Sequence, residues 1–180
     1  AMAVFQGYIS DNRYYYAMYP YDKNAYMSGN VLYFSLPQTQ RYSSESFGAE
    51  MNPMVSYVSQ GEELHFHNLC GVLVLRMTGD FSVKSISFSG KDSLDAPAKV
   101  AGNAQVNMGY EEYPELVMGE DAADCVVLDC GEGVVINPSE PTLFYLVLPP
   151  ATYNSFTVTV VSADGKIFTK EGTKPLTVKR

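Results

Sequence analysis

Apolar and polar residues alternate with a period of two over many short stretches of this chain. In the stretch 31–36, for example, Leu32, Phe34 and Leu36 fall on one face. Because successive side chains of a β-strand point to opposite faces, this alternation predicts half-buried strands. Turn residues separate the stretches at intervals of about eight to twelve residues. The predicted strands are 13–19, 31–36, 54–58, 64–68, 71–78, 83–88, 104–108, 125–128, 134–136 and 142–148.

The clearest local prediction is a β-hairpin near the end of the chain. Residues 156–161 and 166–168 are rich in Val, Thr, Ile and Phe, and Ala163-Asp164-Gly165 lies between them. An Asp-Gly pair supplies the positive φ angles of a tight hairpin turn, and β-branched side chains suit a pleated surface.

Helix signals are nearly absent from the pattern. No stretch longer than about ten residues keeps a helical apolar stripe free of Gly and Pro, and only 41–50 could form one irregular turn. Many short strands without helices predict an all-β fold, an antiparallel β-sandwich or barrel. A sandwich is favoured because 71–77 is almost continuously apolar, as in a central strand covered on both faces, whereas 156–160 alternates. Without repeats or linkers, residues 1–180 are predicted to form a single domain.

Composition and charge narrow the class of protein. Hydrophobic residues make up 46% and charged residues 18%, which excludes a disordered tail and leaves an uncharged polar surface typical of extracellular proteins. The net charge is −8, and no Lys or Arg occurs between Lys99 and Lys166, where acidic residues accumulate. Nucleic-acid binding relies on clustered Lys and Arg, so the sequence predicts no nucleic-acid partner.

The three cysteines predict buried thiols. Cys125 and Cys130 are five residues apart and so lie on opposite faces of a straight strand, which argues against a disulfide between them. Cys70 begins the most apolar strand, and Cys130 closes another. We therefore expect Cys70 and Cys130 to be buried, in line with the preference of free Cys for interiors.

Two groups of residues raise the possibility of a metal site. His65 and His67 share one strand face, but convergent third and fourth ligands are lacking, and Leu64 and Phe66 are expected to point to the core. The acidic stretch 120–124 lacks the alternating oxygen ligands and central Gly of a known calcium loop. Solvated histidines and a solvated loop are the favoured interpretations, so no metal or cofactor is predicted.

Catalytic motifs are not recognisable in the sequence. Neither histidine lies near a nucleophile elbow, and the adjacent Glu111 and Glu112 would face opposite ways on an extended chain. The segment Gly131-Glu132-Gly133 leads into Val134-Val135-Ile136 rather than into a helix, unlike a phosphate-binding loop. The sequence therefore predicts a protein that is not an enzyme.

Tyrosines concentrate near the start of the chain, at 14, 15, 16, 19, 21 and 26. Those between 14 and 19 suit strand positions, where they supply amphipathic bulk. Tyr21 and Tyr26 lie close to Pro20, Asn24 and Gly29 and are expected on a loop, where aromatic rings could bind a sugar. Tyr21 and Tyr26 are thus the candidate ligand-binding residues, with a glycan as the possible ligand.

Several longer motifs follow one another in a characteristic order over about residues 14 to 179. They are Tyr15-Tyr16-Ala17-Met18-Tyr19-Pro20, Leu36-Pro37-Gln38-Thr39-Gln40, Asn52-Pro53-Met54-Val55, Phe66-His67-Asn68-Leu69-Cys70-Gly71, Leu128-Asp129-Cys130-Gly131 and Phe144-Tyr145-Leu146-Val147-Leu148-Pro149-Pro150-Ala151-Thr152-Tyr153. This ordered series resembles the fimbrillin-like surface proteins of gut and oral anaerobes.

The resemblance implies β-sandwich domains of transthyretin-like Greek-key topology, secreted as lipoproteins and displayed at the cell surface, on the outer membrane or in a fimbrium. The implied partners are other fimbrial subunits, joined by strand exchange, or a ligand on a host or bacterial surface. The start of the chain, Ala1-Met2-Ala3, carries no signal or lipidation motif, so we expect any lipid anchor to lie outside this chain.

Three hypotheses of function follow from these observations. The first is a non-catalytic structural or adhesive surface domain, a fimbrial subunit or cell-adhesion module. The second is a glycan-binding module of a surface lipoprotein, and the third is a secreted enzyme with an unrecognised site. The first is the prediction adopted from the sequence, because the resemblance favours it and no catalytic motif supports the third.

Overall fold

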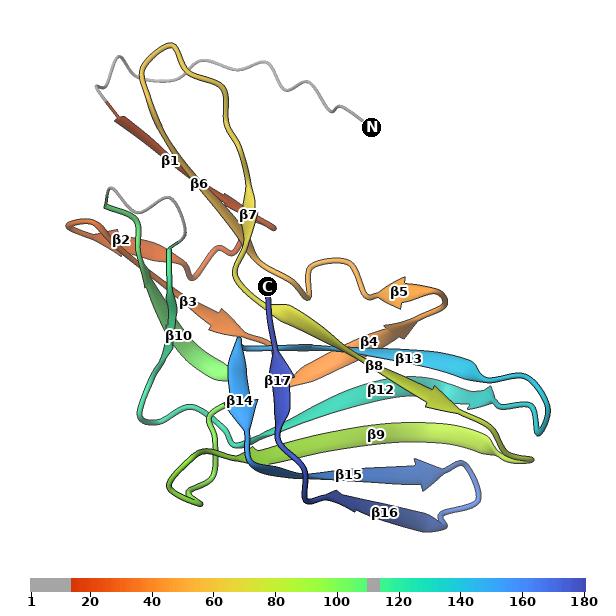
Figure 1. Cartoon of the computed structure of the whole chain (residues 1–180). Coiled ribbons are helices and arrows are strands. Elements are labelled where there is room, and N and C mark those ends of the chain that lie inside the picture. Colours follow the sequence, from red (N-terminus) through yellow and green to blue (C-terminus); the bar gives the residue numbers. More distant parts are fainter. Residues whose placement is uncertain (1–13, 110–113) are drawn as a thin grey trace.

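The computed structural model describes residues 14–109 and 114–180, and in these residues every regular element is a β-strand (Figure 1). The strands before residue 80 are β1 (Tyr14–Tyr19), β2 (Tyr26–Ser28), β3 (Val31–Leu36), β4 (Thr39–Ser43), β5 (Ser46–Phe47), β6 (Met54–Ser59), β7 (His67–Asn68) and β8 (Gly71–Met77). The later strands are β9 (Ser82–Lys91), β10 (Gly102–Asn107), β11 (Leu116–Met118), β12 (Cys125–Val135), β13 (Thr142–Leu148), β14 (Ala151–Tyr153), β15 (Ser155–Ser162), β16 (Ile167–Gly172) and β17 (Leu176–Val178). The predicted all-β fold is confirmed.

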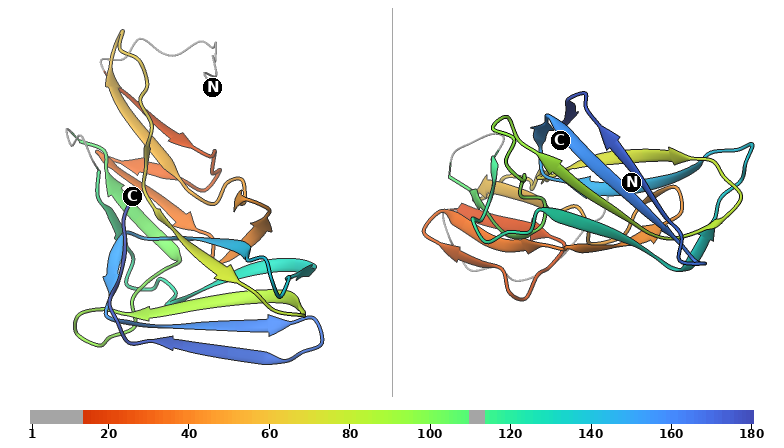
Figure 2. Two further views of the ribbon diagram at one scale, coloured as in Figure 1. Left: turned by 45° about the vertical axis from the view of Figure 1, so that its right-hand side comes forward. Right: turned by 90° about the horizontal axis from the view of Figure 1, so that it is seen from below.

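The larger part of the structure is a sandwich built on a six-stranded sheet with the order β16-β15-β9-β12-β4-β5. Its pairings are antiparallel except for β12 with β4, which run parallel. The two-stranded sheet β13-β8 packs against it, and the small pair β14-β17 closes one end (Figure 2). Side chains from both layers form the first core, which includes Ile86, Phe88, Leu128, Phe144 and Leu146.

A second core lies between the four-stranded sheet β11-β10-β3-β2 and the strands around β6. The alternation predicted for β3 is confirmed, because Leu32, Phe34 and Leu36 are all buried in this core. Val55 of β6 and Cys70 complete it from the opposite side. In the left view of Figure 2, the strands around this second core lie above the six-stranded sheet.

Strand β13 connects the two cores. Leu146 and Leu148 point into the first core, and Val147 between them points into the second. The backbone of Val147 meets the buried side chain of Gln40: the Gln40 amide nitrogen donates to Val147 O at 2.7 Å, and Val147 N–H donates to Gln40 Oε1 at 2.8 Å. One glutamine thus satisfies the backbone of β13 on the edge away from β8.

The hairpin predicted near residues 156–168 is confirmed. β15 and β16 pair from Phe156 with Gly172 to Val161 with Ile167, and Gly165 in the turn has φ +82°. Val158 and Val160 are buried, as their alternation predicted.

Among the predicted helical and strand segments before residue 80, three are wrong. Residues 41–50 form the hairpin of β4 and β5 rather than a helical turn, with Glu45 at φ 65° in its turn. The strand expected over 64–68 is reduced to His67–Asn68, and Leu64 and Phe66 are 48% and 41% exposed instead of core-facing. The error at 64–68 arises because alternation suggests a strand, whereas only His67 and Asn68 pair with another strand, β6. The error at 41–50 has a different cause, since the chain reverses at Glu45 and its two sides pair as β4 and β5.

The third concerns 71–77, which was expected to be a central strand covered on both faces. β8 pairs only with β13 in the described structure, and Val74 is 43% exposed. A continuously apolar sequence therefore marks a strand at an edge here, with Leu73, Leu75 and Met77 packed against the first core while still partly exposed.

Candidate functional site

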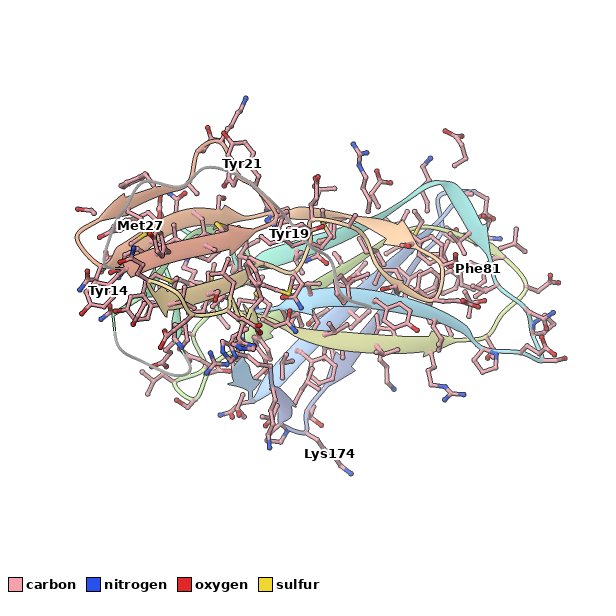
Figure 3. All side chains as sticks on the ribbon, turned by 90° about the horizontal axis from the view of Figure 1, so that it is seen from above. Tyr14, Tyr19, Tyr21, Met27, Phe81 and Lys174 are labelled. Atoms are coloured by element: carbon pink, nitrogen blue, oxygen red, sulfur yellow. The ribbon has the colours of Figure 1, made fainter. Side chains whose placement is uncertain are left out.

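The loop between β1 and β2 carries the first candidate residue, Tyr21. Asp22 shapes this loop, since its side chain accepts a hydrogen bond from Asn24 N at 2.8 Å and its carbonyl accepts one from Ala25 N at 3.1 Å. Tyr21 projects from it, away from the strands, with 88% of its surface exposed (Figure 3). The prediction of a loop tyrosine is confirmed for Tyr21.

Tyr26, the second candidate, begins strand β2 instead of lying on the loop. It faces Tyr33 of β3 directly across the strand pair, and the two rings stack with centroids 5.0 Å apart and an angle of 10° between their planes. Tyr26 remains 60% exposed. The strand position fixes this ring more firmly than a loop would, because the cross-strand partner restricts its rotation.

The two candidate tyrosines line neighbouring hollows. One, of about 320 Å³, is lined by Tyr26, Tyr33, Asn24, Ser35 and Asn103 among others. The other, of about 410 Å³, is lined by Tyr21 and again by Asn24 and Ser35. The structure therefore brings Tyr21 and Tyr26 to adjacent sites that share two polar residues.

Tyr33 and Asn103 are site residues that the sequence pattern did not identify. Tyr33 alternates with buried Leu32 and Phe34 and so reads only as an outward strand position. Asn103 Nδ2 donates to Asp121 Oδ2 at 2.8 Å, which orients the amide at the rim of the hollow. Only the pairing of β3 with β10, which sets Ser35 opposite Asn103, brings these residues together.

The acidic stretch 120–124 is held in place by backbone hydrogen bonds as well as by the hydrogen bond that Asp121 accepts from Asn103. Ala123 N–H donates to Ala101 O at 2.8 Å, and Val100 N–H donates to Ala123 O at the same distance. Ala122 is buried between them. In the described residues, no three His, Cys, Asp or Glu side chains are grouped so that they could hold a metal ion.

A further hollow, of about 630 Å³, is lined by His65, His67, Glu62, Glu63 and by β6 residues that include Ser56. The two histidines differ in burial, since His65 is exposed and His67 is half-buried. The Ser56 hydroxyl is buried and has no hydrogen-bond partner within the described parts of the chain, so neither histidine is positioned to activate it. Glu111 and Glu112, considered above as a carboxylate pair, lie outside the described residues.

The three thiols are all unbridged, and Cys70 and Cys130 are buried as predicted. Burial raises the pKa of Cys70 to about 12, and burial together with the Asp129 carboxylate raises the pKa of Cys130 to about 11. Cys125 is only half-buried, and burial and Asp124 raise its pKa as well. None of these environments produces the lowered pKa of a reactive cysteine.

No helix in residues 14–109 or 114–180 is long and apolar enough to cross a membrane. Comparisons of the whole chain with protein-family models, with curated proteins and with solved structures found no match.

Proposed function

We propose that this chain is a non-catalytic structural or adhesive domain of a bacterial cell surface, of the fimbrillin-like kind, which meets neighbouring subunits by strand pairing. The resemblance described above supplies the class, including the transthyretin-like Greek-key topology. The observation that carries the proposal is the edge of β8 (Gly71–Met77), which has one strand neighbour, β13, in the described structure.

The register of β13 with β8 identifies the backbone groups that this edge offers. Val147 gives both its N–H and its carbonyl to Gln40, so its partner Val72 belongs to a non-hydrogen-bonded pair. In an antiparallel ladder such pairs alternate with hydrogen-bonded ones. The N–H and carbonyl groups of Val72, Val74 and Arg76 therefore point away from β13, toward the open edge.

An added strand would bury the apolar side chains beside this edge further from solvent. Leu73, Leu75 and Met77 pack against the first core but remain partly exposed. Phe168 of β16 is the cross-strand partner of Val160, so both side chains lie on the face of the six-stranded sheet that is turned to the first core. Val160 is buried there, whereas Phe168 is 45% exposed. An edge with outward backbone donors and adjoining apolar side chains is the arrangement that β-strand addition uses.

A single proline tests the edge without breaking the fold. Val74→Pro removes one outward N–H, which β13 does not use, and proline is tolerated on edge strands in that orientation. The matched control is Val74→Thr, which keeps the N–H. We expect the full-length protein with Val74→Pro to fold, by circular dichroism, but to lose concentration-dependent assembly in light scattering, while Val74→Thr assembles like the wild type.

Localisation is tested separately by immunolabelling the full-length protein in its host. Label on surface fibres is the expected result. Confinement to the cytoplasm, assembly unaffected by Val74→Pro, or hydrolysis of a surface glycan at ordinary enzymatic rates (about 1–1,000 s⁻¹) would each refute the proposal.

A further inference from the structure

We infer that the outer face of the sheet β11-β10-β3-β2 is a binding site for a neutral glycan. The inference goes beyond strand pairing and does not depend on the β8 edge. Figure 3 places Met27 near one end of the molecule and Phe81, which follows β8 in the chain, near the other, while Tyr21 projects from the side between them.

Strand register defines the residues of this face. The inner face carries Leu32, Phe34, Leu36, Ala104 and Val106, all buried in the second core. The alternate residues therefore point outward. By cross-strand partnership they form one central row, which runs Tyr26, Tyr33, Gln105, Val117.

Flanking rows extend the face on both sides. Ser35 and Asn103 are partners on one side, and Val31 and Asn107 on the other. Ser35, Asn103 and Asn107 are exposed, and Val117 is 49% exposed. With strands about 4.8 Å apart and alternate residues about 7 Å apart, the rows form a platform of roughly 14 by 14 Å.

The tyrosine pair supplies an apolar contact for a sugar ring. Stacking of Tyr26 on Tyr33 occupies one face of each ring and holds both rings in place. The hollow of about 320 Å³ beside them is within the size range of small-ligand sites, about 300–1,000 Å³. The C–H face of a pyranose can pack on such a ring, which buries apolar surface at little entropic cost.

The polar residues suit hydroxyl groups. Amide and hydroxyl side chains both donate and accept hydrogen bonds, as sugar hydroxyls do. Asn103 is pre-oriented, because its Nδ2 donates to Asp121 and its Oδ1 is left as an acceptor. Gln105 stands between Tyr33 and Val117 and adds a second amide.

Charge selects a neutral ligand. None of the eight residues in the three rows is charged, and neither is Ser28 beyond them, so the face offers no Lys or Arg to a sulfate, phosphate or uronate. Lys23 lines the neighbouring hollow, together with Asp22 and Glu50. The net charge of −8 further disfavours nucleic acids, whose bases could also stack on tyrosine.

Affinity electrophoresis tests the inference with defined polysaccharides in the gel. The neutral probes are mixed-linkage β-glucan, galactomannan, dextran and soluble starch, and the anionic probes are heparin and polygalacturonate. We expect at least one neutral polysaccharide to retard the wild-type chain, with the same retardation at low and at physiological salt because no ion pair is involved. Heparin and polygalacturonate should have no effect.

Variants assign the binding to this face. Tyr33→Ala and Tyr26→Ala should weaken binding about tenfold or more, as loss of an aromatic anchor does, and Asn103→Ala should weaken it less. The matched control is Phe168→Ala in β16 of the six-stranded sheet. It removes a partly exposed ring that stacks on Phe81, with ring centroids 4.9 Å apart. Gln105→Ala leaves the ring pair intact and serves as the second variant if Tyr33→Ala unfolds.

Several outcomes would overturn the inference. They are retardation by none of the neutral probes, retardation by anionic probes only, and an equal loss in Phe168→Ala. Self-association that depends on Tyr26 and Tyr33 would instead assign the face to a second copy of the chain. Val74→Pro should retain glycan binding, so failure at this face and failure of the strand-pairing proposal are distinguishable.

Discussion

Replacement of Gln40 by Leu should destabilise the fold more than any exposed polar substitution. The Gln40 amide makes two hydrogen bonds to the backbone of Val147, at 2.7 and 2.8 Å, and is only 3% exposed. Leucine leaves the Val147 N–H and carbonyl unsatisfied, at about 1–3 kcal/mol each. Burial of the apolar leucine side chain offsets roughly 1–2 kcal/mol of this cost. We therefore expect a net loss of about 2–4 kcal/mol in the free energy of unfolding.

Urea denaturation followed by circular dichroism measures this loss. The matched control is Gln38→Leu, two residues away and exposed, which should change stability by less than about 0.5 kcal/mol. Similar stabilities for the two variants would refute the role given to Gln40.

Gln40→Glu tests the same contact through pH. An ionised carboxylate accepts from Val147 N–H but cannot donate to the carbonyl, and its burial is unfavourable, whereas the protonated acid can make both bonds. Burial raises the pKa of the new carboxyl above its unfolded value of about 4.3. Its deficit relative to wild type should therefore be smallest below pH 4 and grow as pH rises. A deficit independent of pH would contradict this reasoning.

Three further predictions concern the first core and the thiols. Gly90→Ala would place a Cβ 2.4 Å from Cδ1 of the fully buried Tyr153, so a loss of about 1–3 kcal/mol is expected in urea denaturation, and less in a Tyr153→Leu background. In native protein at pH 8, Cys125 should react with a thiol reagent before Cys70, whose pKa of about 12 keeps it protonated. Because the unfolded chain releases these protons from about pH 8.5, stability should fall as pH rises from about 9 toward 12. Rapid reaction of all three thiols in the folded state would contradict the burial.

The sequence by itself determined the class of the fold and the hairpin near its end. Alternation of period two needs only a strand with one buried face, so β3 and β15 were predictable. The Asp164-Gly165 turn fixed the hairpin of β15 and β16 in the same way. Counting along one strand placed Cys125 and Cys130 on opposite faces, in agreement with the absence of a bridge between them, and the burial of Cys130 followed from the preference of free Cys for interiors.

Tertiary structure decided which strands are central and which lie at an edge. The residues 125–128 and 134–136 were predicted as two strands, but β12 is continuous, with a register shift between Asp129 and Val134. Gly131 and Gly133, at φ 61° and 121°, permit the irregularity. The sequence shows that glycines are present there, whereas the path across them depends on the neighbouring strand β9.

The candidate site shows the same division. Tyr21 and Tyr26 could be found from the sequence because tyrosines beside Pro, Asn and Gly suggest an exposed segment. Tyr33 and Asn103 could not be found, since they are 70 residues apart and meet only through the pairing of β3 with β10. Local pattern fixes which way a side chain points along its own strand. Its neighbours across the sheet are set by long-range register, which depends on the packing of the whole chain.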